Sequence, residues 1–238
     1  MLLFYVRHGD PTYTPDALTP LGELQAQAIK YRLGVHGLDQ IFASSSNRAY
    51  QTARPTADML KKDITVLDWC NEKYAWEQLT VTREDGRLIW AFQHEPTREL
   101  FVQEEIRLLG KKWYEHPAFA DTSFCRGMER IQREADAFLL SLGYRHLPDK
   151  NCYIAERPNN DRIALFAHQG FGLAFLSCLL DVPYPEFSTR FDMGHSGMTV
   201  VEFDNKEGMV IPRILQLAND SHIYKEGLPL QYQNRVYL

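Results

Sequence analysis

The stretch MLLFYVRHGD (residues 1–10) is the part of the sequence that decides the fold. Leu2 to Val6 is an apolar run with aromatic and β-branched members, which is the pattern of a buried strand. It ends at Arg7, His8 and Gly9, and ligands bind at the carboxyl ends of strands in open α/β sheets. Arg7 can bind a phosphate or carboxylate through two hydrogen bonds, and His8 can be a base, a nucleophile or a metal ligand. Gly9 permits a sharp turn or a close approach to a ligand.

A second apolar run repeats this arrangement far along the chain. Ile163 to Ala167 is expected to be a buried strand, and it ends at His168. A glycine follows, and then an apolar helix over about 172–180. Two unrelated turn residues would give the same pattern, but two strands that both end at a histidine favour one site at one edge of a parallel sheet.

The segment between the first strand and the insertion alternates helices with short strands. Helices are predicted over about 20–33 and 47–60, and strands at 41–43 and 65–67. Arg48 lies in the first turn of the second helix, where the helix dipole disfavours a cation unless an anion is bound there. A solvated arginine and an anion-binding arginine both fit this position. Glu72, in the loop after the third strand, is either a general acid or a surface carboxylate.

Residues 75–160 are more polar and mostly helical in pattern. Helices are expected over 99–114 and 126–142, and residues 150–160 read as a polar loop. No linker rich in Gly, Ser or Pro separates this region from its flanks. The sequence therefore predicts a single domain over residues 1–238, with a mainly helical insertion over the active-site edge.

The remaining segments are expected to be simpler. Residues 10–17 read as a loop because of their two prolines. Residues 197–204 and 209–217 are expected to pair as a hairpin. The tail, 225–238, has apolar residues that suit docking on the body or on a partner, and the sequence does not decide between them.

Composition limits the kinds of partner. The chain has 238 residues with 45% hydrophobic content, a formal net charge of −5 and no Lys/Arg run, so nucleic acid and anionic membrane surfaces are not expected partners. No apolar run reaches the roughly 18 residues of a membrane span, and the first residues lack the pattern of a signal peptide. The four cysteines form no CxxC pair, which argues against a zinc site or a disulfide framework and suits a reducing cytoplasm.

Five pieces of the chain together resemble the histidine phosphatase superfamily, the phosphoglycerate mutase-like proteins. The pieces are LLFYVRHGD (2–10), LTPLGELQA (18–26), SSSNRAYQTA (44–53), NEKY (71–74) and LFAHQG (165–170). They occur in the family's order, and the resemblance is weakest in the helical insertion. It implies an α/β fold, a three-layer α/β/α sandwich around a mostly parallel sheet.

The resemblance also implies a role for each site residue. His8 matches the phosphate-accepting nucleophile, Arg7, Arg48 and His168 match the rest of the phosphate pocket, and Glu72 matches the proton donor. A neutral imidazole can attack a phosphomonoester dianion without charge repulsion, and the arginines can neutralise the phosphoryl oxygens. This chemistry requires neither a metal nor another cofactor.

Two residues leave the edge of the site open. Gln169 stands where many members have a glycine, and Asp10 stands where Glu or Gln is frequent. Glu77, five residues after Glu72, is an alternative proton donor.

We therefore expect a cytoplasmic, metal-independent phosphomonoesterase that hydrolyses a small phosphate monoester through a phosphohistidine. The sequence names neither the substrate nor the oligomeric state. A phosphoglycerate mutase-type phosphotransferase and a non-catalytic phosphate-binding module are the alternatives. The segment after the proton donor lacks the longer basic stretch of the mutases, and the full set of pocket residues argues against a non-catalytic module.

Overall fold

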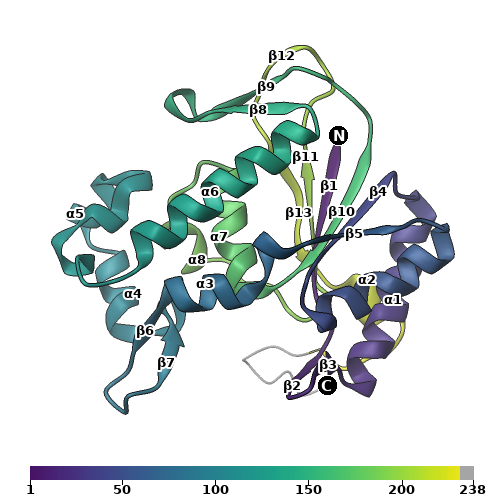
Figure 1. Cartoon of the computed structure of the whole chain (residues 1–238), viewed down its shortest axis with the longest axis horizontal. Helices are drawn as coiled ribbons and strands as arrows, with labels where there is room; N and C mark the ends of the chain where they lie inside the picture. The colour runs from purple at the N-terminus through teal and green to yellow at the C-terminus, as the bar shows by residue number, and fades with distance from the viewer. Residues whose placement is uncertain (231–238) are drawn as a thin grey trace.

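The computed structural model, which describes residues 1–230, is built around a six-stranded sheet (Figure 1). The strands are β1 (Leu2–Arg7), β4 (Gln40–Ser44), β5 (Ile64–Leu67), β10 (Arg162–Ala167), β11 (Met198–Glu202) and β13 (Arg213–Asn219). Their order is β13-β11-β1-β10-β4-β5. The four strands from β1 to β5 in this order are parallel to one another, and β11 pairs antiparallel with both of its neighbours, β1 and β13. Residues 231–238, the end of the predicted tail, lie outside the described residues.

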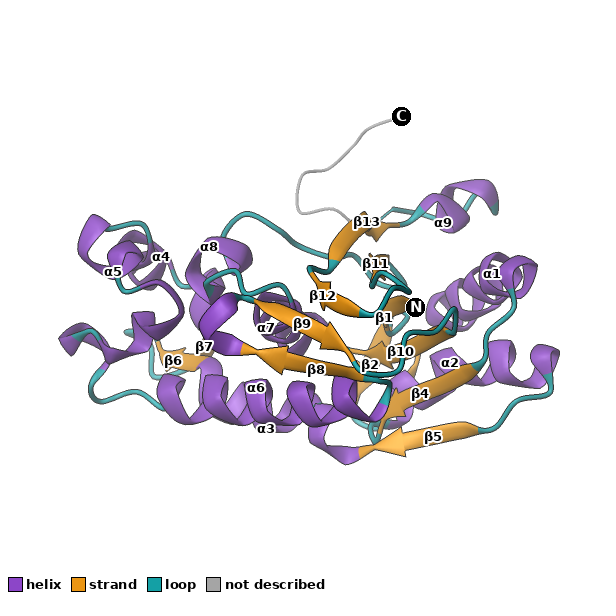
Figure 2. Cartoon of the chain, turned by 90° about the horizontal axis from the view of Figure 1, so that it is seen from above, coloured by secondary structure: helices purple, strands orange, loops and turns teal. Residues whose placement is uncertain are grey.

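Helices cover both faces of this sheet (Figure 2). Helices α1 (Pro20–His36) and α2 (Asn47–Leu60) lie on one face, and α6 (Phe124–Ser141) and α7 (Gln169–Leu179) lie on the other. Alternation along β1 accounts for both layers, because Phe4 and Val6 pack toward α1 and α2 while Leu3 and Tyr5 pack toward α6 and α7. The predicted three-layer α/β/α sandwich is confirmed.

The segment between β5 and β10 forms the insertion, which extends the layer of α6 and α7 (Figure 1). Besides α6, its helices are α3 (Glu72–Leu79), α4 (Glu95–Phe101) and α5 (Glu104–Leu108), and its 3-10 turns are η1 (Asp68–Cys70), η2 (Ala91–Gln93), η3 (Gly110–Glu115), η4 (Pro117–Phe119) and η5 (Pro148–Lys150). Its strands are β6 (Thr80–Thr82), β7 (Leu88–Trp90), β8 (Tyr144–Leu147) and β9 (Cys152–Ala155). Trp113 is the buried centre of an aromatic cluster, with ring centroids 5.1 Å from Phe101 and 5.7 Å from Tyr184.

The single helix predicted over 99–114 is wrong. The chain there forms α4, α5 and η3, with Gln103 in an extended conformation before α5 and Gly110 at a φ of +57° before η3 turns. The predicted apolar side is not one continuous buried face, because Ile106 and Trp113 are buried whereas Leu109 is 38% exposed. The helix predicted over 126–142 is present as α6, and the loop predicted over 150–160 contains β9.

The predicted pairing near the C-terminus needs a correction. Strands β11 and β13 do pair antiparallel, but a separate strand, β12 (Gly208–Val210), leaves the expected hairpin and pairs with β9 in a three-stranded sheet with β8. Residues 10–17, predicted as a loop, contribute the two-stranded hairpin of β2 (Pro11–Tyr13) and β3 (Asp16–Leu18). Two short helices complete the described chain, α8 (Tyr184–Ser188) and α9 (Ser221–Lys225).

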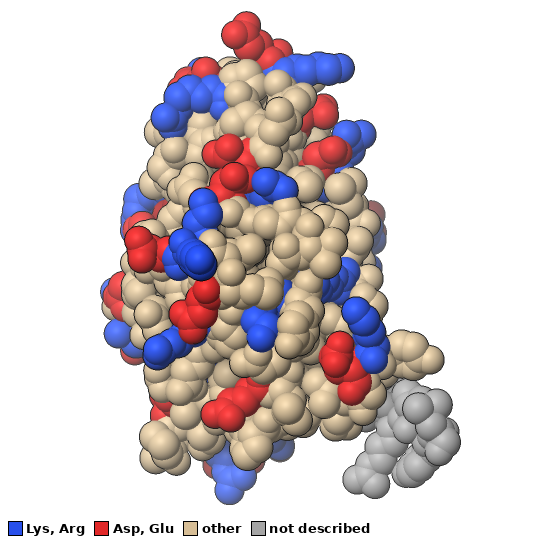
Figure 3. Space-filling model, turned by 90° about the vertical axis from the view of Figure 1, so that its right-hand side faces the viewer, with Lys and Arg blue, Asp and Glu red and all other residues tan. Residues whose placement is uncertain are grey.

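The surface shows no single-sign patch on the face drawn in Figure 3. Lys and Arg side chains there are interspersed with Asp and Glu. Among the helices of residues 1–230, none is long and apolar enough to cross a membrane.

A buried charge network joins the insertion to the end of α7. The ring of His146 on β8 lies between two carboxylates, with Nδ1 2.9 Å from Asp136 Oδ1 and Nε2 3.1 Å from Asp181 Oδ2. Lys111 Nζ lies 2.7 Å from the other oxygen of Asp181. Burial alone would lower the pKa of His146, but its hydrogen bonds to both aspartates outweigh burial and raise that pKa to about 9.

This raised pKa predicts a stability that falls at high pH. Because the folded pKa of His146 exceeds its unfolded value of about 6.5, the stabilisation is complete below about pH 6.5 and is lost as the pH rises through about 9. Urea unfolding from about pH 6 to pH 10 should therefore show a steeper loss of unfolding free energy in the wild type than in His146→Gln, whose side chain takes up no proton. Equal pH dependence in the two proteins would contradict this assignment.

Candidate active site

The pairing of β1 with β10 brings the two strand-ending histidines together. The two strands run parallel with Arg7 opposite Ala167, so His8 and His168 follow as neighbours at the carboxyl edge of the sheet. Their ring centroids lie 5.2 Å apart, and both residues are fully buried. The structure therefore brings together the two histidines that the sequence places 160 residues apart.

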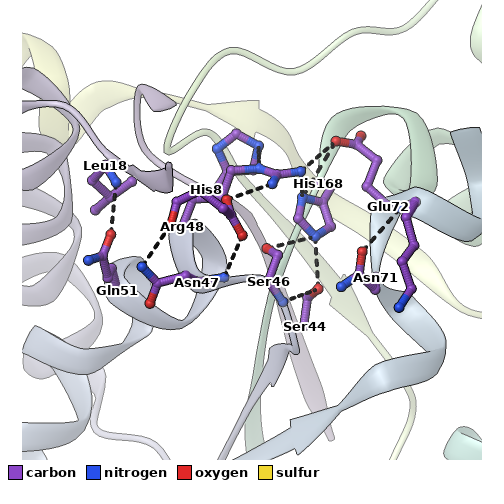
Figure 4. Close-up of polar contacts among 12 residues, drawn as sticks. His8, Leu18, Ser44, Ser46, Asn47, Arg48, Gln51, Asn71, Glu72 and His168 are labelled. Carbon is purple, nitrogen blue, oxygen red and sulfur yellow. Dashed lines mark hydrogen bonds and ion pairs between the residues drawn. The ribbon is translucent and has the colours of Figure 1, made fainter. Parts of the chain in front are cut away.

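The hydrogen bonds of His8 determine its tautomer. Its Nδ1 lies 2.7 Å from the carbonyl oxygen of Gly9, which only accepts, so Nδ1 has the proton and donates it. The lone pair is consequently on Nε2, which accepts a hydrogen bond of 3.2 Å from Arg48 Nε (Figure 4). His8 therefore presents an unprotonated nitrogen to the centre of the site.

His168 is the opposite tautomer to His8. Its Nδ1 accepts from Arg48 Nη2 at 3.2 Å, so the ring proton is on Nε2. Nε2 lies 2.8 Å from Oγ of Ser44, the last residue of β4, and 3.3 Å from Oγ of Ser46, the residue before α2 (Figure 4). The serine-rich segment before α2 thus fixes the second imidazole.

Burial keeps both imidazoles neutral. Removal from water lowers the pKa of His8 well below 6.5, and electrostatic interactions with His168, Arg7 and Arg48 lower it further. Burial followed by the charges of Arg48 and Arg7 does the same to the pKa of His168. The cluster therefore combines two neutral imidazoles with two guanidinium groups.

Arg48 is the connecting side chain of the site. Besides its bonds to both histidines, its Nη2 lies 3.1 Å from Glu72 Oε2 and its Nη1 lies 2.8 Å from Asp16 Oδ1. Its side chain is 11% exposed, so Arg48 is not a solvated arginine, and its binding of an anion stays a prediction. The first turn of α2 thus positions the guanidinium group of Arg48 at the carboxyl edge of the sheet.

Glu72 reaches the cluster from the first residue of α3. Its Oε1 accepts a hydrogen bond of 3.0 Å from the backbone N–H of Gly170 in the first turn of α7, and its Oε2 lies 3.6 Å from His168 Nδ1. Glu77, the alternative proton donor, is exposed on the same helix. Of the two carboxylates, the structure places Glu72 in the cluster.

Arg7 and three helix termini complete an anion-binding environment. The guanidinium of Arg7 donates from Nη1 to the carbonyl oxygen of Met193 at 2.6 Å, while its Nε is buried and makes no hydrogen bond with residues 1–230. The N-termini of α2, α3 and α7 all supply residues to the cluster. Helix N-termini favour a bound anion, so a phosphate fits this position.

Sequence reasoning missed Asp16, which supports Arg48 from the β2–β3 hairpin. Besides its ion pair with Arg48, its Oδ2 accepts from the backbone N–H of Asn47 at 2.7 Å and its carbonyl oxygen accepts from the Asn47 side chain at 2.8 Å. The ring of Tyr13 lies 5.2 Å from the guanidinium carbon of Arg48. No sequence signal marked this hairpin, because its residues read as a loop.

The edge of the site contains His195 as well as Asp10 and Gln169. His195, which the sequence did not single out, lies with its ring 5.7 Å from that of His8 and its Nδ1 3.3 Å from Asp10 Oδ1. Asp10 also accepts a hydrogen bond of 2.6 Å from Thr19 Oγ1, and Gln169 donates to Asp192. The two departures from the family pattern thus have partners within the protein.

Gly9 is required for a packing reason that the sequence did not indicate. A Cβ at this position would lie 2.6 Å from the carbonyl oxygen of Gly22 in the first turn of α1. Gly9 therefore lets the chain after β1 approach the first turn of α1 closely, and a side chain at this position would clash with that turn.

Comparisons with known proteins agree with this geometry. Residues 3–113 match the model of the histidine phosphatase superfamily (branch 1), so the predicted resemblance is confirmed for this part of the chain. A protein of Hydrogenobacter thermophilus, whose name marks it as a candidate phosphoserine phosphatase, is 22% identical over 88% of this chain and 93% of its own length.

Solved structures show the same fold. A phosphoserine phosphatase variant from Entamoeba histolytica, in complex with phosphoserine, is 17% identical, covers 93% of this chain and 98% of its own, and has a TM-score of 0.58. A mycobacterial glucosyl-3-phosphoglycerate phosphatase with inorganic phosphate is 20% identical, has the same two coverages and has a TM-score of 0.57.

We predict that Asp16 positions Arg48 for phosphate binding. A hydrogen bond to a charged group is worth about 1.5–3 kcal/mol, so Asp16→Ala should lower kcat/KM for an aryl phosphate about 10-fold or more. Asp16→Asn should recover part of this loss, because its amide oxygen still accepts from Arg48. The matched control is Asp58→Ala, which removes an exposed pair with Arg54 on the same helix. A wild-type kcat/KM in Asp16→Ala would show that Arg48 needs no support from the hairpin.

Proposed function

We propose that this protein, with its match to the histidine phosphatase superfamily, is a phosphomonoesterase that forms a phosphohistidine on His8. The observation that supports this proposal most directly is the lone pair on His8 Nε2, which faces Arg48 in a cluster with His168 and Glu72. The names of the similar proteins agree with hydrolysis of small phosphate esters, phosphoserine among them.

In the proposed mechanism the substrate's phosphoryl group enters the positive end of the site. Arg7 and Arg48 bind its oxygens, and the N-termini of α2 and α7 add backbone dipoles. These groups are already oriented by Met193 and Asp16, so little reorganisation is needed as charge spreads over the phosphoryl oxygens in the transition state.

The nucleophile in this mechanism is neutral His8. Because its Nδ1–H is held by Gly9, Nε2 can attack phosphorus directly, and the bond from phosphorus to the ester oxygen breaks. The proton that stays on Nδ1 makes the phosphorylated ring cationic, and the Gly9 carbonyl stabilises it. No separate base is needed for this step.

The leaving oxygen needs a proton, which we assign to Glu72. In the free protein its oxygens accept hydrogen bonds from Arg48 and from the backbone N–H of Gly170, beside the proposed phosphate position. Glu72 then donates to the leaving alkoxide, and as a carboxylate it takes a proton from the water that cleaves the phosphohistidine. In the free protein His168 faces the site with the lone pair of Nδ1, so it donates to a phosphoryl oxygen only after its proton moves from Nε2 to Nδ1.

The setting we propose is a cytoplasmic enzyme of one domain. The described cysteines are free, and Cys70, Cys152 and Cys178 are buried, which suits a reducing compartment. A small phosphomonoester is the only partner that this proposal requires.

Two alternatives are separated by turnover assays. A phosphatase hydrolyses p-nitrophenyl phosphate and releases inorganic phosphate from a panel of small esters that includes phosphoserine. A mutase isomerises phosphoglycerate, and a non-catalytic phosphate-binding module shows no turnover at all. Isomerisation without hydrolysis, or the absence of turnover, would reject the proposal.

The covalent intermediate is the first prediction of this mechanism. Rapid acid-free quenching followed by mass spectrometry should find an acid-labile phosphate on His8, because its Nε2 presents a lone pair beside Arg48 and the Gly9 carbonyl, which accepts from Nδ1, stabilises the phosphorylated cationic ring. His8→Asn should carry no label. A phosphate on His168 with none on His8 would reverse the two roles.

The second prediction concerns the proton donor. General acid catalysis is worth about 10²–10⁴-fold, and its value depends on how poorly the leaving group departs. Glu72→Gln should therefore slow single-turnover phosphoryl transfer from an alkyl phosphate far more than from p-nitrophenyl phosphate, whose phenolate is already stable. Glu77→Gln, an exposed position on the same helix, is the matched control.

Equal losses on both substrates in Glu72→Gln would mean that Glu72 binds or positions and does not donate. A leaving-group-dependent loss in Glu77→Gln, with none in Glu72→Gln, would move the role to Glu77.

A further inference from the structure

Three electron-pair donors, one from each of three side chains, face one another at the centre of the site. His8 Nε2 and His168 Nδ1 both present lone pairs, because each ring has its proton on the other nitrogen. Glu72 Oε2 is the third donor. One ligand atom from each residue lies within 4.8 Å of the other two, and the three side chains face one another in Figure 4. This is the arrangement of a cation site.

A cation already lies there in the free protein, namely the guanidinium of Arg48. Its Nε and Nη2 donate to all three residues, at 3.1–3.2 Å for the hydrogen bonds. Its third nitrogen, Nη1, is bonded separately to Asp16 at 2.8 Å. Another cation can therefore take the three donors only if the guanidinium group turns its Nε and Nη2 away from them, about the ion pair that Nη1 makes with Asp16.

The donor set selects the kind of ion. Two imidazoles and one carboxylate are a zinc ligand set, whereas Mg²⁺ and Ca²⁺ prefer oxygen ligands. Imidazole ligands of metals commonly donate their other N–H to a backbone carbonyl or another acceptor, and here His8 donates to Gly9 and His168 donates to Ser44. Glu72 is 14% exposed and begins a helix, so its side chain can adjust to close the ligand geometry from the open side.

We propose that His8, His168 and Glu72 bind Zn²⁺ or a similar divalent transition-metal ion, and that this ion inhibits the enzyme. The inhibition follows from the shared atom, because the lone pair of His8 Nε2 cannot attack phosphorus while it is bonded to a metal. The binding claim stands on the geometry alone, and only the inhibition rests on the proposed function.

The binding arm uses EDTA-treated, desalted protein and Co²⁺ as a spectroscopic probe for Zn²⁺. The wild type should bind one equivalent of Co²⁺, give the intense visible bands of a four-coordinate site with nitrogen ligands, and lose them on addition of Zn²⁺. His8→Asn and His168→Asn should each weaken binding by more than the ~10–100-fold that loss of an outer partner costs. The control, His116→Asn, removes a histidine that pairs with Glu105 in the insertion, and it should bind like the wild type.

Absence of the bands in the wild type, or equal Co²⁺ binding by His8→Asn and the wild type, would overturn the proposal. These outcomes are independent of turnover, so they remain decisive even if the protein hydrolyses no phosphate ester.

The inhibition arm measures hydrolysis of p-nitrophenyl phosphate by the EDTA-treated enzyme. Zn²⁺ should inhibit competitively with the ester, excess EDTA should restore the full rate, and Mg²⁺ at the same concentration should have no effect. His116→Asn should show the same inhibition constant as the wild type. Activation by Zn²⁺, or inhibition that substrate does not relieve, would contradict an inhibitory ion at His8.

Discussion

The parallel pairing of β1 with β10 is the constraint on which the site depends. With Arg7 opposite Ala167, the next residue of each strand is a histidine, and both rings emerge at the same edge. A register shift of one residue would turn His8 to the opposite face of the sheet from His168. The register is held by burial on both faces, since Leu3 and Tyr5 pack under α7 while Phe4 and Val6 pack under α1. Hydrophobic packing of the strand interiors thus sets the chemistry at their ends.

The position of the two histidine rings at this edge also has an electrostatic consequence. The rings are buried beside two guanidinium groups, so their neutral forms are favoured and each keeps a lone pair. Arg48 then bridges the lone pairs, while Asp16 and Glu72 balance its charge. An entering phosphate replaces part of this internal pairing and meets donors that are already oriented. The same lone pairs make the cluster suitable for a transition-metal ion.

Much of this arrangement can be predicted from the sequence, for physical reasons. The strand runs before His8 and His168 are apolar enough to be read as buried, and the position of Arg48 in the first turn of α2 is enough to make it a candidate anion ligand. Asp16 was missed because its role depends on a hairpin whose pairing no short pattern marks. The break between α4 and α5 was missed because tertiary packing around Trp113 overrides a helical period. The need for Gly9 follows from a packing partner on α1 that is not visible in local sequence.

The central claim is that two buried, neutral imidazoles of opposite tautomer form the working centre. Long-range ¹H–¹⁵N NMR spectra of the histidine rings test it directly, with assignments from His8→Asn and His168→Asn. At about pH 6.5, where a free imidazole is half protonated, His8 should be neutral with its proton on Nδ1 and His168 neutral with its proton on Nε2. A doubly protonated ring at His8 at that pH, or a His8 proton on Nε2, would contradict the account.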